Sequence, residues 1–383
     1  MRDDARVPSE VNGMVFDGQL LTVADYEHAT RQITSPAMFE YQYGTIGDPR
    51  WSTYTSNRAG FEALKLRPRV LVDVGERSLA TTLLGVELSF PVVVGPTGGL
   101  GGLDPLAEIP TAKAAGAAGT IMVLSGASTC PTDEVAAAAT GPWFQQVWMH
   151  DDRTLVEWQV RTAAEFGAAA VVLTVSNTGE TWHTFQLRFQ RDSAGESDSA
   201  GESDSMSNLR GYDGKIPTVD EFLDSMSRST TWKDIEWLRD LTPLPLVIKG
   251  IQTAEDAALS VEHGAAAIVV SNHGGRFLQG SRGTIEALPE IVAVVNGRID
   301  VCLDGGVRQG QDVLKALALG AKAVWIGRAA RWGTTVNGEA GVRDVLEILR
   351  RELDGTMGLC GVADVRDVPP SLVTRDAVPT REG

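Results

Sequence analysis

Eight short apolar runs alternate with segments of helical spacing along this 383-residue chain, and this rhythm constrains the fold more than any other feature. The runs are 91–95, 119–124, 143–148, 169–175, 244–249, 266–271, 299–304 and 323–327. A strand–helix repeat builds a parallel sheet, and eight such units close into a (β/α)8 barrel. A doubly wound open sheet is the alternative, but no Gly-x-Gly-x-x-Gly follows the first run. We therefore predict an α/β protein, a TIM barrel that forms one domain over residues 1–383.

The rhythm is interrupted once, after the fourth run, by an insertion that we assign to residues 176–230. Residues 193–198 read Ser-Ala-Gly-Glu-Ser-Asp and are repeated at once in 199–204. Acidic low-complexity sequence buries too little apolar surface to order itself. We predict a partly disordered lid over the catalytic face of the barrel, with a solvated linker as the alternative for the repeat itself. At the other end, we predict a flexible N-terminus over 1–20, followed by a helical lead-in.

The composition excludes several classes of protein. A formal net charge of −16 disfavours nucleic-acid or anionic-membrane binding, so a small anionic substrate needs a local positive pocket. Cys130, Cys302 and Cys360 are widely spaced and form no Cys-x-x-Cys pair, which argues against a disulfide framework and a metal site. The sequence shows neither a signal peptide nor an apolar stretch of membrane-spanning length, so we expect a soluble cytoplasmic protein.

The sixth run ends in Ser-Asn-His-Gly-Gly-Arg, residues 271–276, which we interpret as a catalytic junction. Two glycines after a buried strand allow a tight turn that brings the backbone close to a ligand. His273 can move a proton near neutral pH, and Arg276 can bind a carboxylate through two hydrogen bonds. A lone histidine is more often structural, but its place at a strand end favours catalysis. The pair suits proton abstraction from a small acid.

Polar residues also follow the other apolar runs, where a barrel binds its ligands. These positions are Thr97, Gly98, Ser125, Gln145, Thr174, Lys249, Asp304, Gly306, Arg308, Gly327 and Arg328. The last two runs end in glycines and an arginine, which favours a phosphate site over turn-forming glycines with surface arginines. Lys249 ends an otherwise apolar strand, so it either has a buried anion or carbonyl partner or extends to the barrel rim.

Several motifs between about residues 26 and 373 together have a specific counterpart among known proteins. They are Asn57-Arg58, residues 66–69, 96–98, 249–250, 271–276 and 304–310, and Gly327-Arg328. Through them the chain resembles the FMN-dependent α-hydroxy-acid oxidase and dehydrogenase family, which includes glycolate oxidase, lactate oxidase and mandelate dehydrogenase. The resemblance implies a (β/α)8 barrel that binds FMN and oxidises a 2-hydroxy acid to the 2-oxo acid, commonly as a homotetramer.

The resemblance also implies a role for each matching position. His273 would be the base that takes the substrate hydroxyl proton as hydride passes to flavin N5, and Arg276 and Tyr41 would bind the substrate carboxylate. The flavin contacts are Thr97 and Gly98 near N5, Ser125, Gln145 and Thr174 at the ring, Lys249 at N1, Ser271 near the ribityl chain, and Asp304, Gly306, Arg308, Gly327 and Arg328 at the ribityl chain and phosphate.

Three positions depart from the family pattern. Val147 stands where the family has an active-site tyrosine, Ser176 where an aspartate supports the imidazolium, and His183 near the place of a second arginine. The missing aspartate should lower the pKa of His273 by about 1–3 units. The other two changes should weaken the hold on a small acid by about 2–4 kcal/mol. We therefore expect a larger substrate, in contact with Val147 and Trp182.

Two other functions are compatible with the same residues. The substitutions also fit changed chemistry on an α-substituted acid, such as oxidative decarboxylation, monooxygenation, amine oxidation or isomerisation. A flavin-binding protein without turnover is a third hypothesis, which the presence of His273 and Arg276 argues against. Gly98, where many oxidases of the family carry alanine, favours a dehydrogenase or a monooxygenase.

Overall fold

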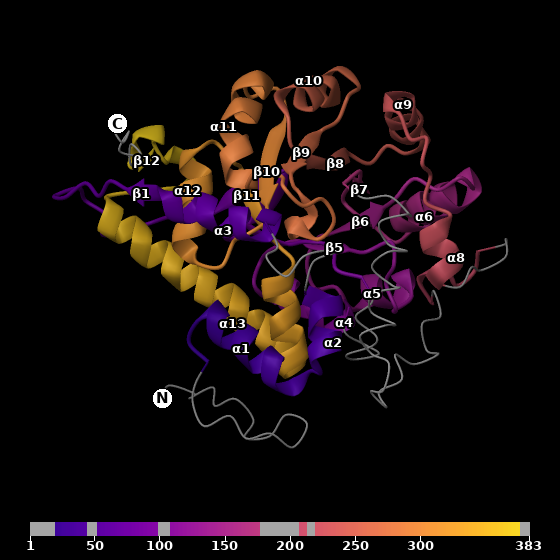
Figure 1. Cartoon of the computed structure of the whole chain (residues 1–383), viewed down its shortest axis with the longest axis horizontal. Coiled ribbons are helices and arrows are strands. Elements are labelled where there is room, and N and C mark those ends of the chain that lie inside the picture. Colours follow the sequence, from indigo (N-terminus) through magenta and orange to yellow (C-terminus); the bar gives the residue numbers. More distant parts are fainter. Residues whose placement is uncertain (1–19, 44–51, 99–107, 177–206, 213–218, 376–383) are drawn as a thin grey trace, which may run out of the picture.

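The computed structural model describes residues 20–43, 52–98, 108–176, 207–212 and 219–375. Within these ranges, parallel strands close into a barrel in the order β10-β11-β4-β5-β6-β7-β8-β9 (Figure 1). Their bounds are β4 Val92–Val94, β5 Met122–Leu124, β6 Trp143–Val147, β7 Val171–Thr174, β8 Leu246–Ile251, β9 Ala267–Val270, β10 Asp300–Asp304 and β11 Ala323–Ile326. The circle closes between β11 and β4, where Trp325 pairs with Val93. The predicted (β/α)8 barrel is confirmed.

Helices surround the barrel and cover the outer face of its strands (Figure 1). Those that follow strands are α4 Glu108–Ala117, α5 Thr132–Ala138, α6 Arg153–Glu165, α9 Trp232–Leu241, α10 Ala254–Glu262, α11 Thr284–Val295, α12 Gly310–Ala318 and α13 Arg328–Cys360. Local caps begin several of them. At the start of α10, the Thr253 side chain accepts a hydrogen bond from Asp256 N at 3.2 Å. Such a cap satisfies an N–H group that has no partner within the helix.

The predicted helical lead-in is present ahead of the barrel. It consists of α1 Val23–Ile33, α2 Pro36–Tyr43 and α3 Ser52–Ala63. After α3, the strand β1 (Leu64–Leu66) pairs antiparallel with β12 (Val373–Arg375), which follows the short helices η4 Val365–Asp367 and η5 Pro370–Leu372. The long helix α13 packs against α1, α4 and α12 and is kinked at Asn337 and Gly338 (Figure 1). The first and last described segments therefore brace the barrel together.

Two layers of apolar side chains form the core, because successive residues of a strand face opposite sides. The inner layer fills the barrel with Val93, Val123, Phe144, Val172, Val247, Ala267, Val269, Cys302, Ala323 and Trp325. Leu83 and Leu88, from the hairpin of β2 (Thr81–Leu83) and β3 (Val86–Leu88), belong to this layer and close its N-terminal end. The outer layer lies between strands and helices. A ligand therefore has access from the C-terminal ends of the strands.

The insertion after β7 returns to the barrel at the end of β6. Its described parts include η2 Ser207–Leu209 and α8 Val219–Asp224. Phe222 and Met226 of this return segment pack in one cluster with Trp148. The acidic repeat at 193–204 and residues 1–19 lie outside the described residues. Within the described ranges, no helix has both the length and the apolar character that crossing a bilayer requires.

Candidate active site

Most barrel strands carry a polar residue on their inward face at the C-terminal end. Each lies two positions after a member of the inner apolar layer, so the alternation of a strand turns it towards the barrel axis. These residues are Ser125, Gln146, Thr174, Lys249, Ser271 and Asp304. All except Asp304 are buried. Buried polar groups need partners, so this ring of side chains is suited to a polar ligand.

Lys249 is buried in an ion pair and does not extend to the barrel rim. Its Nζ lies 2.9 Å from Asp304 Oδ2 and 3.1 Å from Ser271 Oγ. The other carboxylate oxygen, Asp304 Oδ1, is buried and has no hydrogen-bond partner among the described residues. A buried acceptor without a donor is costly, so a ligand hydroxyl or N–H group would be stabilised here.

His273 lies three residues after the end of β9, in a backbone conformation that non-glycine residues seldom adopt, with φ of 55°. Gly274 and Gly275 continue the turn with φ of 66° and 75° inside the short helix η3 (His273–Gly275). The imidazole Nδ1 lies 2.9 Å from Ser176 Oγ, and Phe277 packs edge-on at 4.7 Å between ring centroids. Strained backbone of this kind is found at functional sites, where surrounding contacts hold it.

The imidazole of His273 is held in its neutral form. Burial lowers its pKa well below the usual value, and neighbouring positive charges lower it further. These charges belong to Lys249, Arg276 and Arg328. Among the described residues, the ring hydrogen bonds through Nδ1, which leaves Nε2 as the nitrogen for a substrate proton. The predicted proton acceptor therefore lies at the barrel mouth in the form that accepts a proton.

Asn57 of α3 joins two loops at the barrel mouth. Its amide pairs reciprocally with that of Asn272, with N···O distances of 2.9 and 2.8 Å. The loop after β10 contacts the same residue through Gly306, which has a φ of 89°. The contact is close, since a Cβ built at Gly306 would be only 2.9 Å from Asn57 O. Asn57 belonged to a matching motif but had no predicted role, since its partner lies 215 positions away.

Arg308 and Arg328 lie beyond β10 and β11, where they could together bind an anion. Burial and the nearby charge of Arg308 lower the pKa of Arg328 to about 10. Arg328 Nη2 donates to Gly274 O, whereas Nη1 is buried without a hydrogen-bond partner among the described residues. Arg328 also begins α13, which adds the positive end of a helix dipole. An anion with several oxygens would satisfy both the charge and the open donor.

A buried carboxylate positions this anion site. Asp312 is 2% exposed and accepts from Arg308 N at 2.9 Å. The same carboxylate pairs with Arg58 at 2.7 Å, and the Arg308 guanidinium lies over Trp332 at 4.6 Å. Arg58 and Asp312 had no predicted role, because 254 positions separate them. They hold the loop after β10 before any ligand binds.

The register of β6 differs by one residue from the predicted one. Phe144 belongs to the inner apolar layer and Val147 to the outer layer. The alternation therefore turns Gln146, and not Gln145, towards the barrel axis. Gln146 Oε1 accepts from Gly126 N at 2.9 Å, and its Nε2 is buried without a partner among the described residues. The pocket position of Val147 was predicted wrongly, and the ring contact predicted for Gln145 becomes a proposal for Gln146.

Trp148, the next inward position of this strand, forms an aromatic wall beside the mouth. It is 6% exposed and packs edge-on against Phe222, with ring centroids 6.2 Å apart. A Cβ built at Gly126 would lie 3.4 Å from Trp148 Cε3, so the loop after β5 borders the same ring. The apolar contact that was predicted for Val147 is therefore available from Trp148.

The loop after β4 brings Thr97 and Gly98 to the same opening. A Cβ built at Gly98 would lie 2.9 Å from Ser125 Oγ, and one built at Gly327 would lie 3.7 Å from Thr97 Cγ2. The loops after β4, β5 and β11 are thus in direct contact. Of the predicted substrate residues, Tyr41 lies in α2, whereas Trp182 and His183 lie outside the described residues. Their roles stay predictions.

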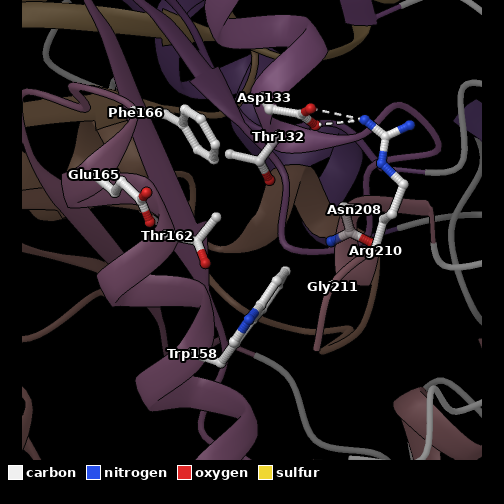
Figure 2. A pocket seen from close by; sticks show the side chains of 9 residues that line it. All are labelled: Thr132, Asp133, Trp158, Thr162, Glu165, Phe166, Asn208, Arg210 and Gly211. Carbon is white, nitrogen blue, oxygen red and sulfur yellow. Dashed lines mark hydrogen bonds and ion pairs between the residues drawn. The ribbon is translucent and has the colours of Figure 1, made fainter. Parts of the chain in front are cut away.

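A separate pocket of about 230 Å³ lies on the outer side of the barrel, between α5, α6 and the residues after η2 (Figure 2). Trp158 and Phe166 line it, and Arg210 pairs with Asp133 at 2.7 Å along its edge (Figure 2). The pocket belongs to the helix shell and contains none of the predicted site residues. We therefore assign the chemistry to the barrel mouth.

An anion site beside a neutral histidine at the C-terminal end of a barrel is the arrangement of a barrel enzyme that uses a phosphorylated cofactor. The family model of the FMN-dependent dehydrogenases matches residues 29–375. The chain therefore belongs to this family of FMN-dependent 2-hydroxy-acid oxidases and dehydrogenases, and it is an oxidoreductase.

Individual relatives cover nearly the whole chain. Glycolate oxidase 3 of Arabidopsis thaliana is 40% identical over 365 residues, which are 94% of this chain and 97% of the relative. L-Lactate oxidase of Nostoc sp. is 40% identical over 368 residues, with 92% and 98% covered. A soluble mutant of the membrane-associated (S)-mandelate dehydrogenase from Pseudomonas putida has a TM-score of 0.83 at 31% identity, with 94% and 100% covered.

The chemistry of the open polar groups fits FMN. Arg328 Nη1 can donate to a phosphate oxygen, Asp304 Oδ1 can accept from a ribityl hydroxyl, and Gln146 Nε2 can donate to a ring acceptor. Each of these atoms is buried and has no hydrogen-bond partner among the described residues. Bound FMN would therefore supply hydrogen-bond partners that these three atoms lack among the described residues.

Proposed function

We propose that the protein oxidises a 2-hydroxy acid larger than glycolate or lactate to the 2-oxo acid, with His273 as the base. The observation that carries this proposal is the place of His273 at the barrel mouth, where its Nδ1 lies 2.9 Å from Ser176 Oγ. Burial and the charges of Lys249, Arg276 and Arg328 lower its pKa there, which favours the neutral form that accepts a proton. Relatives named glycolate oxidase and L-lactate oxidase, and solved structures of mandelate oxidase, support the class of substrate.

In this proposal the chain supplies positioning and proton transfer. Arg276 and Tyr41 bind the substrate carboxylate, and His273 Nε2 takes the proton when the O–H bond of the substrate breaks. Held by the residues of the barrel mouth, FMN would supply the acceptor for the hydride from C2, so that the substrate would lose two electrons and two hydrogens and become the 2-oxo acid. Lys249 would place a positive charge beside the flavin ring, which gains negative charge when it is reduced.

The preference for a larger substrate is supported by the apolar wall at the end of β6. Trp148, Phe222 and Met226 pack there in one cluster. Contact with such a surface stabilises a bound apolar side chain by about 25 cal/mol per Å² that leaves water. Trp182 is proposed as a further apolar contact of the substrate, and His183 is proposed at the place of the family's second arginine. A homotetramer is proposed from the family resemblance, and sedimentation of the purified protein tests it. The cytoplasmic location stays a prediction from the sequence.

The role of His273 is tested by anaerobic flavin bleaching with a panel of aliphatic and aromatic 2-hydroxy acids. His273→Asn should still bind FMN but reduce it about 10²–10⁴-fold more slowly, because general-base catalysis contributes that much. The matched control is His263→Asn, since His263 lies in the helix shell and pairs with Glu236 at 2.9 Å. Wild-type flavin reduction by His273→Asn would exclude this histidine as the base.

A second candidate is changed chemistry on an α-substituted acid, which Ser176 favours by replacing the carboxylate expected behind the base. Oxidative decarboxylation and monooxygenation give carbon products that differ in mass from the 2-oxo acid, and amine oxidation gives the 2-oxo acid together with ammonia, which hydroxy-acid oxidation does not release. Mass spectrometry of the products therefore separates the two candidates. Monooxygenation is included in this second candidate because Gly98 stands where many oxidases of the family carry alanine.

A further inference from the structure

Ser176 lies directly behind His273, at the end of β7. Its Oγ is 2.9 Å from the imidazole Nδ1. A Cβ built at Gly250 would lie 2.9 Å from Ser176 N, so the residue is enclosed on the side of β8. A hydroxyl group can orient the ring by one hydrogen bond, but it carries no charge. A carboxylate in that place would also stabilise the protonated ring.

The charges that act on the ring within the described residues are positive. Lys249 contributes from β8, Arg276 from the end of η3, and Arg328 from the start of α13. The carboxylate of Asp304 on β10 is paired with Lys249 at 2.9 Å. A proton on Nε2 therefore adds a positive charge to a cationic cluster. In the holoenzyme the FMN phosphate would balance Arg308 and Arg328, as Asp304 balances Lys249, so the protonated ring beside Arg276 still needs negative charge from another source.

We propose that Ser176 is a positioning residue that orients His273 without a counter-charge, so that the negative charge balancing the protonated ring arrives with the substrate. This inference rests on the proposed role of His273 as the base. An acid bound beside Arg276 enters the same cationic cluster and raises the proton affinity of the ring while it is bound. The strength of the base is thereby coupled to the charge of the substrate.

The test compares Ser176→Asp with Ser176→Asn, which have nearly the same shape and differ in charge. The measured quantity is the rate constant of anaerobic flavin reduction divided by the dissociation constant of the substrate. Its dependence on pH reports the pKa values of the free enzyme. Ser176→Asp should raise the pKa of its acidic limb by about 1–3 units, and Ser176→Asn should leave it unchanged. The ratio of this quantity for a 2-hydroxy acid to that for its amide measures the preference for a charged substrate. Ser176→Asp should lower this ratio by about 10-fold or more. Identical profiles and preferences in the two variants would overturn the inference.

A binding measurement tests the same inference without turnover. Calorimetry of oxalate binding near pH 5–6, in buffers of different ionisation enthalpy, should show proton uptake by the wild-type holoenzyme. Uptake should fall in Ser176→Asp, and it should be absent in His273→Asn and with neutral oxamide. No uptake by the wild type would overturn the inference about Ser176. By contrast, normal flavin reduction by His273→Asn would overturn the proposed function, whatever calorimetry shows.

Discussion

Gln145 and Gln146 are neighbours in β6, yet they face opposite sides of the barrel wall. Gln146→Leu should remove a donor to the flavin ring, shift the flavin absorbance and weaken FMN binding by about 0.5–1.5 kcal/mol, the net value of one hydrogen bond. Gln145→Leu is the matched control, because its side chain faces the helix shell. Spectra and FMN titrations of the apoproteins compare them. Equal effects of both substitutions would contradict the inward register of Gln146.

His150 is a fully buried histidine that the proposed chemistry does not use. Its Nδ1 lies 2.8 Å from Ser225 Oγ, and its ring packs 4.4 Å from that of Phe222. Burial lowers its pKa from 6.5 to about 4. The folded state therefore keeps the ring neutral in a pH range where the unfolded chain binds a proton. The stability present above pH 6.5 is lost as the pH falls towards 4.

Between about pH 7 and pH 5 this linkage amounts to about 2 kcal/mol of the free energy of unfolding. His150→Gln should reduce the loss of stability over that interval, whereas His28→Gln, at an exposed site on α1, should not. Urea unfolding at the two pH values measures the difference. The same pH dependence in His150→Gln and the wild type would show that another group is responsible.

The glycines of the helix α13 lie in sharply different environments. At the kink, Gly333 and Gly341 pack on each other, since a Cβ built at Gly333 would lie 2.6 Å from Gly341 O. Gly341→Ala should lower the free energy of unfolding by about 1–3 kcal/mol, the typical cost of overpacking. Gly355→Ala, on the exposed face with no atom within 4 Å, should raise it by about 0.5–1 kcal/mol. Urea midpoints measure the change in stability of each variant. A Gly341→Ala variant as stable as the wild type would contradict the close contact between Gly333 and Gly341.

At the scale of the whole molecule, the predicted FMN contacts come from strands all around the barrel. Cofactor binding should therefore stabilise the closed barrel as a unit. Free FMN at 100 to 1,000 times its dissociation constant should add about 3–4 kcal/mol to the free energy of unfolding. Comparison of urea midpoints with and without FMN checks this value. A separate unfolding transition whose urea midpoint does not change when FMN is added would contradict a single barrel domain.

Substitution of Arg328 tests how much one side chain contributes to FMN binding and to the stabilisation by FMN. Arg328→Met should raise the FMN dissociation constant about 10–100-fold, because a charged hydrogen bond contributes about 1.5–3 kcal/mol. It should also shrink the stabilisation by added FMN. Arg366→Met removes an exposed arginine that pairs with Asp364 and should leave both quantities unchanged. Fluorescence titration of the apoproteins provides the dissociation constants.

Much of the architecture was predictable from the sequence. The eight apolar runs identified the barrel strands, because a buried parallel strand imposes its pattern on consecutive residues. The polar residue at each strand end indicated the open face, and His273 was recognisable from its place before two glycines. Lys249 was predicted to end its strand, whereas β8 continues to Ile251, and the pairing of Lys249 with Asp304 was not foreseen.

The remaining features depend on contacts between distant segments. Two consecutive glutamines fit either face of β6, and only the closed barrel decided that Gln146 points inwards. Asn57 meets Asn272 across 215 positions, and Arg58 meets Asp312 across 254. The sequence by itself determined the periodic elements and their order, because neighbouring residues encode that periodicity. The tertiary structure decided register and side-chain partners, because these exist only after the barrel has closed and brought the loops together.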